Sequence, residues 1–309
     1  MEEKFQLLKV RQFTEIINDS IAFFRRYFKP VGYTILLLVV PIYVLGSFFY
    51  SDIMNSTNNL GHATNVFNLK RFGVSSILGL LALVIGRMIL TVIFISAFLH
   101  IEQSETGELA SKDIFGSLRS NLARLTGFYL LVLLFGGVIG AIVAIIFAAL
   151  GSASATGLIV ILMLVFVPFL IYISVSLAFI PIIYMRENCG FGEAVSRSFY
   201  LVKNNWWWTL LILMVGGMIG SIGGLVFQLP YTILVAMKTF TSIRTGHTGY
   251  EVSIIDRVAL TLSNFGSIIT TAVVTIVTFM QYYSLVEKKD GISLMSQIDS
   301  IGSDENPSI

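Results

Sequence analysis

A single arginine, Arg87, lies near the centre of the apolar run 74–99. The six long apolar runs of the chain contain no other Lys, Arg, Asp, Glu or His. A guanidinium group is planar and carries five hydrogen-bond donors, which suit the recognition of phosphate or carboxylate. The chemistry that this position indicates is therefore the binding of an anion in apolar surroundings.

The side chains that could accompany Arg87 are neutral, because the apolar runs contain no carboxylate. Hydroxyl groups at comparable depth belong to Tyr43, Tyr172, Ser174 and Thr271. Either interface is roughly 18 Å from Arg87 along the helix, farther than an arginine side chain reaches. We therefore expect the guanidinium to point into the bundle. There it either cross-links helices through these hydroxyls or binds an anionic ligand such as a phospholipid head group.

No other combination of residues indicates catalysis or metal binding. The sequence contains no GxSxG, HExxH or GxxxxGK motif. The only cysteine, Cys189, cannot form an internal disulfide, and His62 and His247 have no third metal ligand nearby. We expect a protein that is not an enzyme and has no cofactor and no metal.

The elements that must position Arg87 are the apolar runs themselves. The chain has 309 residues, of which 55% are hydrophobic and 12% charged, and crossing a membrane takes about 20 apolar residues in a helix. The runs are continuous, unlike the alternating strands of a β-barrel. We expect an all-α polytopic membrane protein with one transmembrane domain over 1–290 and a cytoplasmic tail over 291–309. Its six transmembrane helices are predicted over 31–50, 74–99, 125–150, 158–185, 206–229 and 258–283.

Positive charges are distributed unevenly between the two sides of these helices. The segments on the side of both termini carry 14 Lys and Arg, whereas the opposite segments carry 5. Cytoplasmic segments carry this excess in membrane proteins, so we expect both termini in the cytoplasm. The net charge of +2 is too small to indicate nucleic-acid binding.

The chain contains a repeated unit. The sequence Gly-Gly-Val-Ile-Gly at 136–140 recurs as Gly-Gly-Met-Ile-Gly at 216–220, and the same offset of 80 aligns Asp113 with Glu193. An offset of 178 aligns Glu15 with Glu193. The pattern predicts three transmembrane hairpins, each preceded by an amphipathic helix at the cytoplasmic interface, which could be arranged with pseudo-threefold symmetry. Chance similarity between apolar segments is the alternative.

Small residues follow one face of two predicted helices. They are Gly136 and Gly140 in one helix, and Gly216, Gly220 and Gly224 in the other. Such stripes let neighbouring backbones approach closely. We expect them to pack helices within the chain, and association of two copies into a homo-oligomer is the alternative.

Aromatic residues gather at the inner ends of the last two predicted helices. Trp206, Trp207 and Trp208 begin one, and Tyr282 and Tyr283 end the other. This placement is typical of the aromatic belt at a membrane interface.

The stretch 194–207 reads Ala-Val-Ser-Arg-Ser-Phe-Tyr-Leu-Val-Lys-Asn-Asn-Trp-Trp. It resembles a signature, roughly A-x-x-R-S-x-x-L-x-K-x-x-W-W, of bacterial polytopic proteins: the YciC-like family and the membrane domain attached to some glycerophosphodiester phosphodiesterases. The resemblance implies a six-span protein of the bacterial inner membrane without an established activity. The catalytic residues of the phosphodiesterase are not expected here, because the chain has no room for that soluble domain.

The sequence favours a non-enzymatic inner-membrane protein that serves as a scaffold or accessory subunit of a membrane complex. Its partners would be membrane lipids and a protein at the cytoplasmic face. The alternative is a protein that handles or transports a lipid or small solute and binds an anionic ligand at Arg87 within the membrane. A wet cavity that reaches Arg87 would favour the alternative, and a closed, dry core would favour the scaffold.

Overall fold

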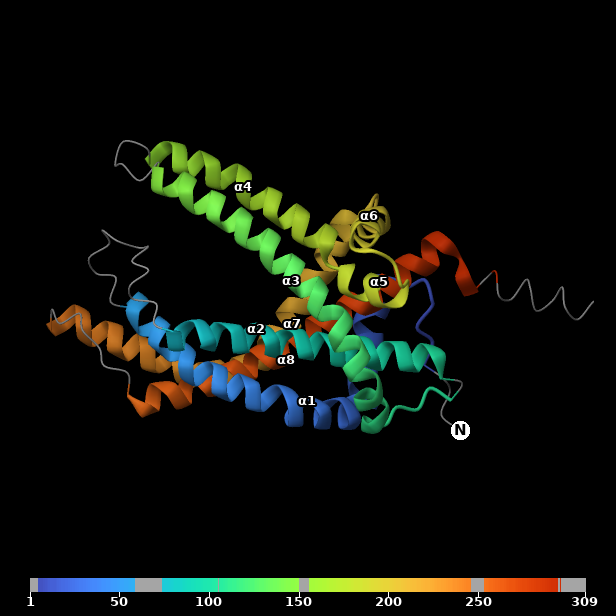
Figure 1. Cartoon of the computed structure of the whole chain (residues 1–309), viewed down its shortest axis with the longest axis horizontal. Coiled ribbons are helices and arrows are strands. Elements are labelled where there is room, and N and C mark those ends of the chain that lie inside the picture. The colour runs from blue at the N-terminus through green and yellow to red at the C-terminus, as the bar shows by residue number, and fades with distance from the viewer. Residues whose placement is uncertain are drawn as a thin grey trace, which may run out of the picture.

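The computed structural model describes residues 5–58, 74–104, 106–149, 156–245, 253–293 and 295. All regular secondary structure within these residues is helical (Figure 1), so the prediction of an all-α chain is confirmed for them. The helices are α1 Phe13–Asn58, α2 Val74–Gln103, α3 Ser111–Ala149, α4 Thr156–Leu177, α5 Ile180–Arg186, α6 Phe191–Val202, α7 Trp206–Thr245 and α8 Ile254–Asp290.

Five segments of the described chain are long and apolar enough to cross a membrane. They are Phe13–Phe49, Ile77–Gln103, Leu164–Arg186, Trp206–Thr245 and Ile254–Asp290. In α3, the described apolar part is the shorter segment Ser120–Leu134. Helices of this length and composition are those of a membrane protein.

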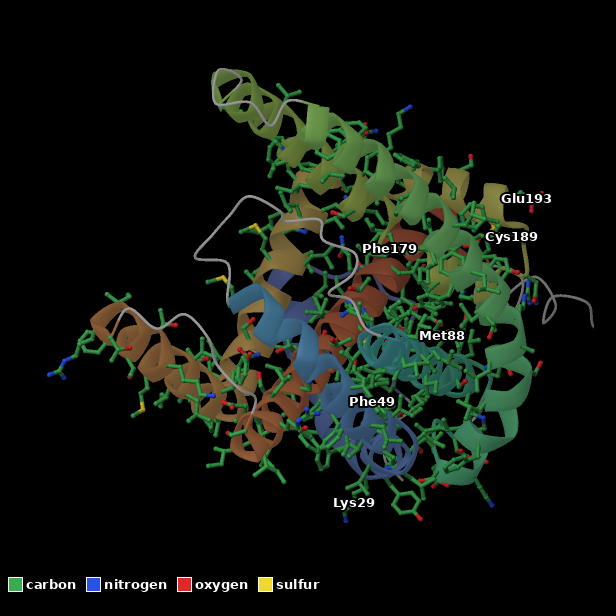
Figure 2. The ribbon with its side chains drawn as sticks, turned by 60° about the vertical axis from the view of Figure 1, so that its left-hand side comes forward. Lys29, Phe49, Met88, Phe179, Cys189 and Glu193 are labelled. Carbon is green, nitrogen blue, oxygen red and sulfur yellow. The ribbon has the colours of Figure 1, made fainter. Side chains whose placement is uncertain are left out.

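The long helices are arranged in pairs. α1 packs along α2, and α7 packs along α8. α3 and α4 lie side by side in both views (Figures 1 and 2). The gap between this pair and the α1–α2 pair widens towards the end of the molecule that is farthest from α6. We call the end of the molecule that contains α6 the α6 end.

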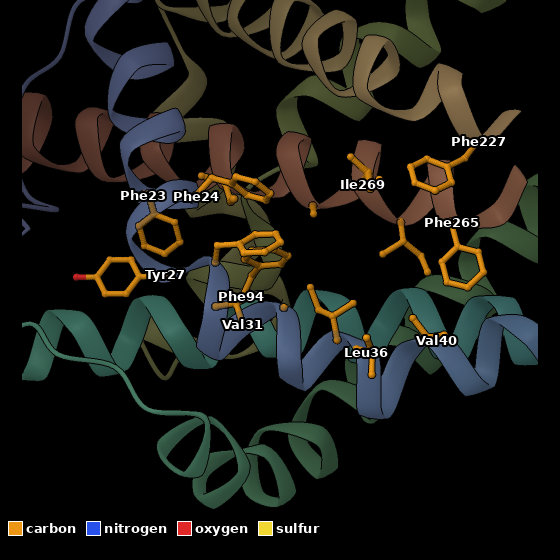
Figure 3. A pocket seen from close by; sticks show the side chains of 16 residues that line it. Phe23, Phe24, Tyr27, Val31, Leu36, Val40, Phe94, Phe227, Phe265 and Ile269 are labelled. Atoms are coloured by element: carbon orange, nitrogen blue, oxygen red, sulfur yellow. The ribbon is translucent and has the colours of Figure 1, made fainter. Parts of the chain in front are cut away.

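The first amphipathic segment and the first predicted span form one helix, α1, of 46 residues. Its direction changes between Tyr27 and Leu36 (Figure 3), around Pro30. A proline inside a helix removes one backbone hydrogen bond and bends the axis. The Pro30 carbonyl accepts hydrogen bonds from Thr34 Oγ1 at 2.8 Å and from Ser111 Oγ at 3.3 Å, so the bend contacts the start of α3.

The predicted span over 158–185 is interrupted. α4 ends at Leu177, and α5 begins at Ile180 with Pro181 in its first turn. Because proline cannot donate the hydrogen bond that would continue the helix, the chain turns at Ala178. α5 then ends at Arg186, beside the C-terminal end of α2.

α7 is longer than the predicted span over 206–229. It has 40 residues and continues through Pro230 to Thr245. On this extension, the Lys238 ammonium forms an ion pair with Asp256 in the first turn of α8. The α7–α8 pair is thereby tied together far from the α6 end.

The core at the α6 end is built from aromatic rings. Phe98 of α2 stacks on Phe23 of α1, with ring centroids 4.3 Å apart, and on Tyr283 of α8 at 6.0 Å. Phe279 meets Phe98 edge-on at 5.3 Å. All four side chains are buried, so α1, α2 and α8 share one core.

The three acids that the repeat aligns have the same role. Each is the third residue of its helix and accepts a hydrogen bond from the backbone N–H three positions earlier, at 2.9–3.0 Å. The residue after each acid is fully buried. The acids are Glu15, Asp113 and Glu193, and the buried residues are Ile16, Ile114 and Ala194.

Candidate functional site

Arg87 lies on α2 with an exposed side chain. Its Nη1 donates to Thr271 Oγ1 on α8 at 3.4 Å, which is long for a hydrogen bond. Its charge also acts on the hydroxyl groups of Tyr43 on α1 and Tyr129 on α3. None of the carboxylates that the structure describes forms an ion pair with Arg87.

The guanidinium is therefore not enclosed by the bundle as the sequence led us to expect. The preceding residue, Gly86, faces α1: a Cβ placed on it would lie 2.6 Å from the Tyr43 ring. Towards the α6 end, α2 is buried from Leu90 to Phe98, whereas Val84 and Ile85, on the other side of Arg87, are exposed. Arg87 thus lies at the boundary between the buried and the exposed part of α2, because α3 moves away from α2 at this point.

Tyr172 and Ser174, which we grouped with Arg87, make their contacts elsewhere. The Tyr172 ring packs on Trp206 with centroids 5.5 Å apart, and its carbonyl accepts from Trp206 Nε1 at 3.3 Å. Ser174 Oγ donates to a carbonyl of its own helix at 3.1 Å. The structure brings Arg87, Tyr43 and Thr271 together and places Tyr172 at the contact between α4 and α7.

The glycine stripe of α7 faces α8. A Cβ added to any of its three members would lie 2.8–3.0 Å from an atom of α8. The members are Gly216, Gly220 and Gly224. Thr270 Oγ1 also donates to the Gly220 carbonyl at 3.0 Å. On α3, no described atom lies within 4 Å of a Cβ placed on Gly140, and the surroundings of Gly136 lie outside the described residues.

A second polar cluster, at the α6 end, is one that the sequence did not reveal. Arg186 donates to the Glu102 carboxylate through Nε at 3.0 Å and Nη2 at 2.6 Å. The Tyr283 hydroxyl donates to the same carboxylate at 2.7 Å. The Tyr282 hydroxyl accepts from Arg186 at 3.2 Å and donates to Glu187 at 3.0 Å. Both tyrosines are fully buried, so the interpretation of this pair as an interfacial belt was wrong.

The cluster continues through Arg197 of α6. Arg197 donates to Glu187 at 3.1 Å and also binds Asp290 at the end of α8. Burial opposes its charged form, but the hydrogen bond to Asp290 and the charge of Glu187 outweigh burial and raise the pKa of Arg197. The adjacent Ser198 donates to the Ser176 carbonyl of α4 at 2.6 Å. Two residues of the signature stretch therefore connect α6 to its neighbours.

The only sequence signal for this cluster was that Glu102 and Arg186 follow the ends of apolar runs. Charges at such positions are ordinary in membrane proteins, so nothing in the sequence indicated that the two are paired. Within the described residues, no group of three or more His, Cys, Asp or Glu could hold a metal ion. The acids of the cluster are instead neutralised by arginine.

The long apolar helices indicate a polytopic helical membrane protein. The chain belongs to a family described as a domain of unknown function, DUF7847, whose model matches residues 117–285, more than half of the chain. The matched region includes Arg186, Arg197 and Tyr283 of the α6-end cluster and leaves out Arg87. No curated protein and no solved structure matches the chain.

Proposed function

We propose that this protein binds an anionic amphiphile within the membrane and that Arg87 contacts the anionic group. The supporting observation is that Arg87 is exposed and makes one long hydrogen bond within the described part of the chain. An arginine at the centre of a crossing helix costs about 2.5–3.5 kcal/mol. A bound phosphate or carboxylate would offset this cost through charge-assisted hydrogen bonds.

The surroundings of Arg87 favour an amphiphile over a free ion. Val84 and Ile85 on α2 and Leu130 on α3 expose large apolar side chains in the same part of the molecule. A ligand that reaches Arg87 therefore needs apolar surface of its own, as a phospholipid has. Tyr43 and Thr271 would add hydroxyl groups beside the guanidinium.

We also propose six crossing helices in three hairpins, α1–α2, α3–α4 and α7–α8, with the α6 end in the cytoplasm of a bacterial cell. The excess of 14 over 5 positive residues supports this orientation in the inner membrane. The 39 continuous residues of α3 support a sixth crossing.

The shared capping by Glu15, Asp113 and Glu193 supports the three-unit repeat with pseudo-threefold symmetry. It is not specific to the repeat, because Asp256 of α8 makes the same cap with Ser253. The resemblance to YciC-like proteins stays a prediction and would explain the same layout.

The scaffold function is the second candidate. It would use the tail over 291–309, most of which lies outside the described residues. A protein partner at the α6 end, or a second copy of this chain, would then accompany the protein through purification.

Native mass spectrometry of protein extracted gently from its own membranes tests these functions. The wild type is expected to carry an anionic lipid at Arg87, and Arg87→Leu is expected to lose it. Arg87→Lys should bind this lipid more weakly, because its ammonium is a point charge and not a planar guanidinium. Lys112→Gln is the matched control, since it removes an exposed positive charge from the first turn of α3. An unchanged number of bound anionic lipids in Arg87→Leu would refute the lipid proposal. A protein that co-purifies with both the wild type and Arg87→Leu would support the scaffold.

A further inference from the structure

An apolar groove lies between α1 and α8 (Figure 3), and Arg87 is not among its lining residues. Its volume is about 410 Å³, within the range of small-molecule sites, and Phe94 of α2 and Phe227 of α7 contribute to its walls. The Tyr27 hydroxyl is the only polar side-chain group among the lining residues, and it donates to the Gly107 carbonyl at 2.8 Å. The groove therefore offers apolar contact and no unsatisfied hydroxyl group.

The groove is long enough to hold one acyl chain. Its lining residues on α8 run from Phe265 to Ile276, inside the crossing segment Ile254–Asp290. At 1.5 Å per residue this distance is roughly 16 Å. The hydrocarbon core of a bilayer is roughly 30 Å thick, so the groove is about as long as the acyl chain of one leaflet.

Two basic residues flank one end of the groove. Phe24 and Phe28 line the end nearer the α6 end, and Arg25 and Lys29, their neighbours on α1, are exposed. Lys29 projects from the surface of the helix (Figure 2). Neither basic residue forms an ion pair with any carboxylate that the structure describes. At the opposite end the lining is aromatic and apolar.

We propose that this groove binds one acyl chain of an anionic phospholipid from the leaflet at the α6 end, and that Arg25 and Lys29 bind its head group. The order of the groove matches that of a phospholipid, with positive charge at the interface and apolar surface towards the bilayer centre. Each basic residue near an anionic head group is worth about fivefold in affinity. The site uses neither Arg87 nor Thr271, so it can be tested independently of the function proposed above.

Gly32 allows the groove to be filled without disturbing the fold. It lines the groove, and a Cβ placed on it would meet only the Phe28 ring, at 4.0 Å. A longer side chain such as leucine at this position should therefore extend into the space of the acyl chain. Gly217 of α7 is the matched control, because a Cβ there has no described atom within 4 Å and the residue does not line the groove.

The test is a titration of delipidated protein with dioleoyl phosphatidylglycerol or dioleoyl phosphatidylcholine, with bound lipids counted by native mass spectrometry. The wild type should prefer phosphatidylglycerol. The double variant Arg25→Gln/Lys29→Gln should bind it about 25-fold more weakly and lose the preference. Gly32→Leu should lose the site for both lipids, and Gly217→Leu should behave as the wild type.

Equal binding of the two lipids by the wild type, or unchanged binding by Gly32→Leu, would overturn the proposal. Arg87→Leu separates the two lipid sites, because it should keep the groove lipid while losing the lipid at Arg87. The melting temperature of each variant shows that it is folded. If Gly32→Leu does not fold, Ile269→Trp fills the same groove from α8.

Discussion

Arg186 of α5 and Glu102 of α2 form a two-point ion pair between residues 84 positions apart, with Nε and Nη2 both donating to the carboxylate. The Tyr283 hydroxyl adds a third bond to Glu102, from α8. Exposed ion pairs contribute little to stability, but these side chains are only 13% and 23% exposed. The pair therefore fixes the positions of three helices at the α6 end.

Removing one partner of this pair should destabilise the protein. Glu102→Leu leaves the Arg186 charge largely buried without its carboxylate, and we expect the free energy of unfolding to fall by about 2–4 kcal/mol. The double variant Glu102→Leu/Arg186→Met should recover most of the loss, because no unpaired charge is left. Thermal unfolding in detergent measures both, and a double variant no more stable than Glu102→Leu would show that the charges are not coupled.

Arg87→Leu should have the opposite effect on stability. No described carboxylate loses a partner, and a costly charge leaves the apolar part of α2. We expect a melting temperature in lipid-free detergent equal to or above that of the wild type. The companion variant is Thr271→Val, which removes the side-chain acceptor that the described residues offer Arg87 and should change the melting temperature little. A clear drop for Arg87→Leu would mean that Arg87 is a structural residue.

Two glycines of α7 should respond oppositely to the same substitution. A Cβ on Gly224 would lie 2.8 Å from the Gly266 carbonyl oxygen, which is backbone and cannot move aside easily. Gly224→Ala should therefore cost about 1–3 kcal/mol of stability. Gly217→Ala meets no described atom within 4 Å and should gain about 0.5–1 kcal/mol from helix propensity. Equal effects in a detergent unfolding assay would argue against the packing of α7 on α8.

Cys189, between α5 and α6, should react with a maleimide in a way that depends on pH and on the side of the membrane. Burial, and after it the charge of Glu187, raise the pKa of this thiol. Since the thiolate is the reactive form, labelling at pH 7 should be slower than for a free cysteine and should rise about tenfold per pH unit until the pH passes the raised pKa.

With the α6 end in the cytoplasm, a membrane-impermeant maleimide should label Cys189 in inverted vesicles and not in intact cells. Cys189→Ser gives the background, because the chain has no other cysteine. Labelling in intact cells would reverse the proposed orientation.

The long helices could be predicted because the length of an apolar run can be read from the sequence. Arg87 could be singled out because it is the only charged residue in such a run. The exact limits of the helices could not be predicted. Proline residues in the sequence do not settle them, because Pro181 interrupts one predicted span, whereas α7 continues through Pro230. Whether a proline bends, ends or merely interrupts a helix depends on the neighbours that satisfy the freed backbone groups.

The α6-end cluster could not be predicted because it depends on pairing between distant segments. Hydropathy does not distinguish a tyrosine at a membrane interface from one in a packed core, and Tyr282 and Tyr283 are fully buried. Likewise, the exposure of Arg87 follows from the divergence of α3, which is a tertiary property. Tyr129 of α3 is an electrostatic neighbour of Arg87. No feature of its apolar run distinguishes it from the other residues there.

The length of α7 determines what the protein presents to the compartment opposite the α6 end. Its 40 residues measure roughly 60 Å, about twice the thickness of the hydrocarbon. The part up to Leu229 is already long enough to cross. We therefore expect the part from Pro230 to Thr245, which the Lys238–Asp256 pair holds to α8, to extend beyond the hydrocarbon on that side. If it does, a protease added on that side of a sealed membrane should cut α7 after Pro230.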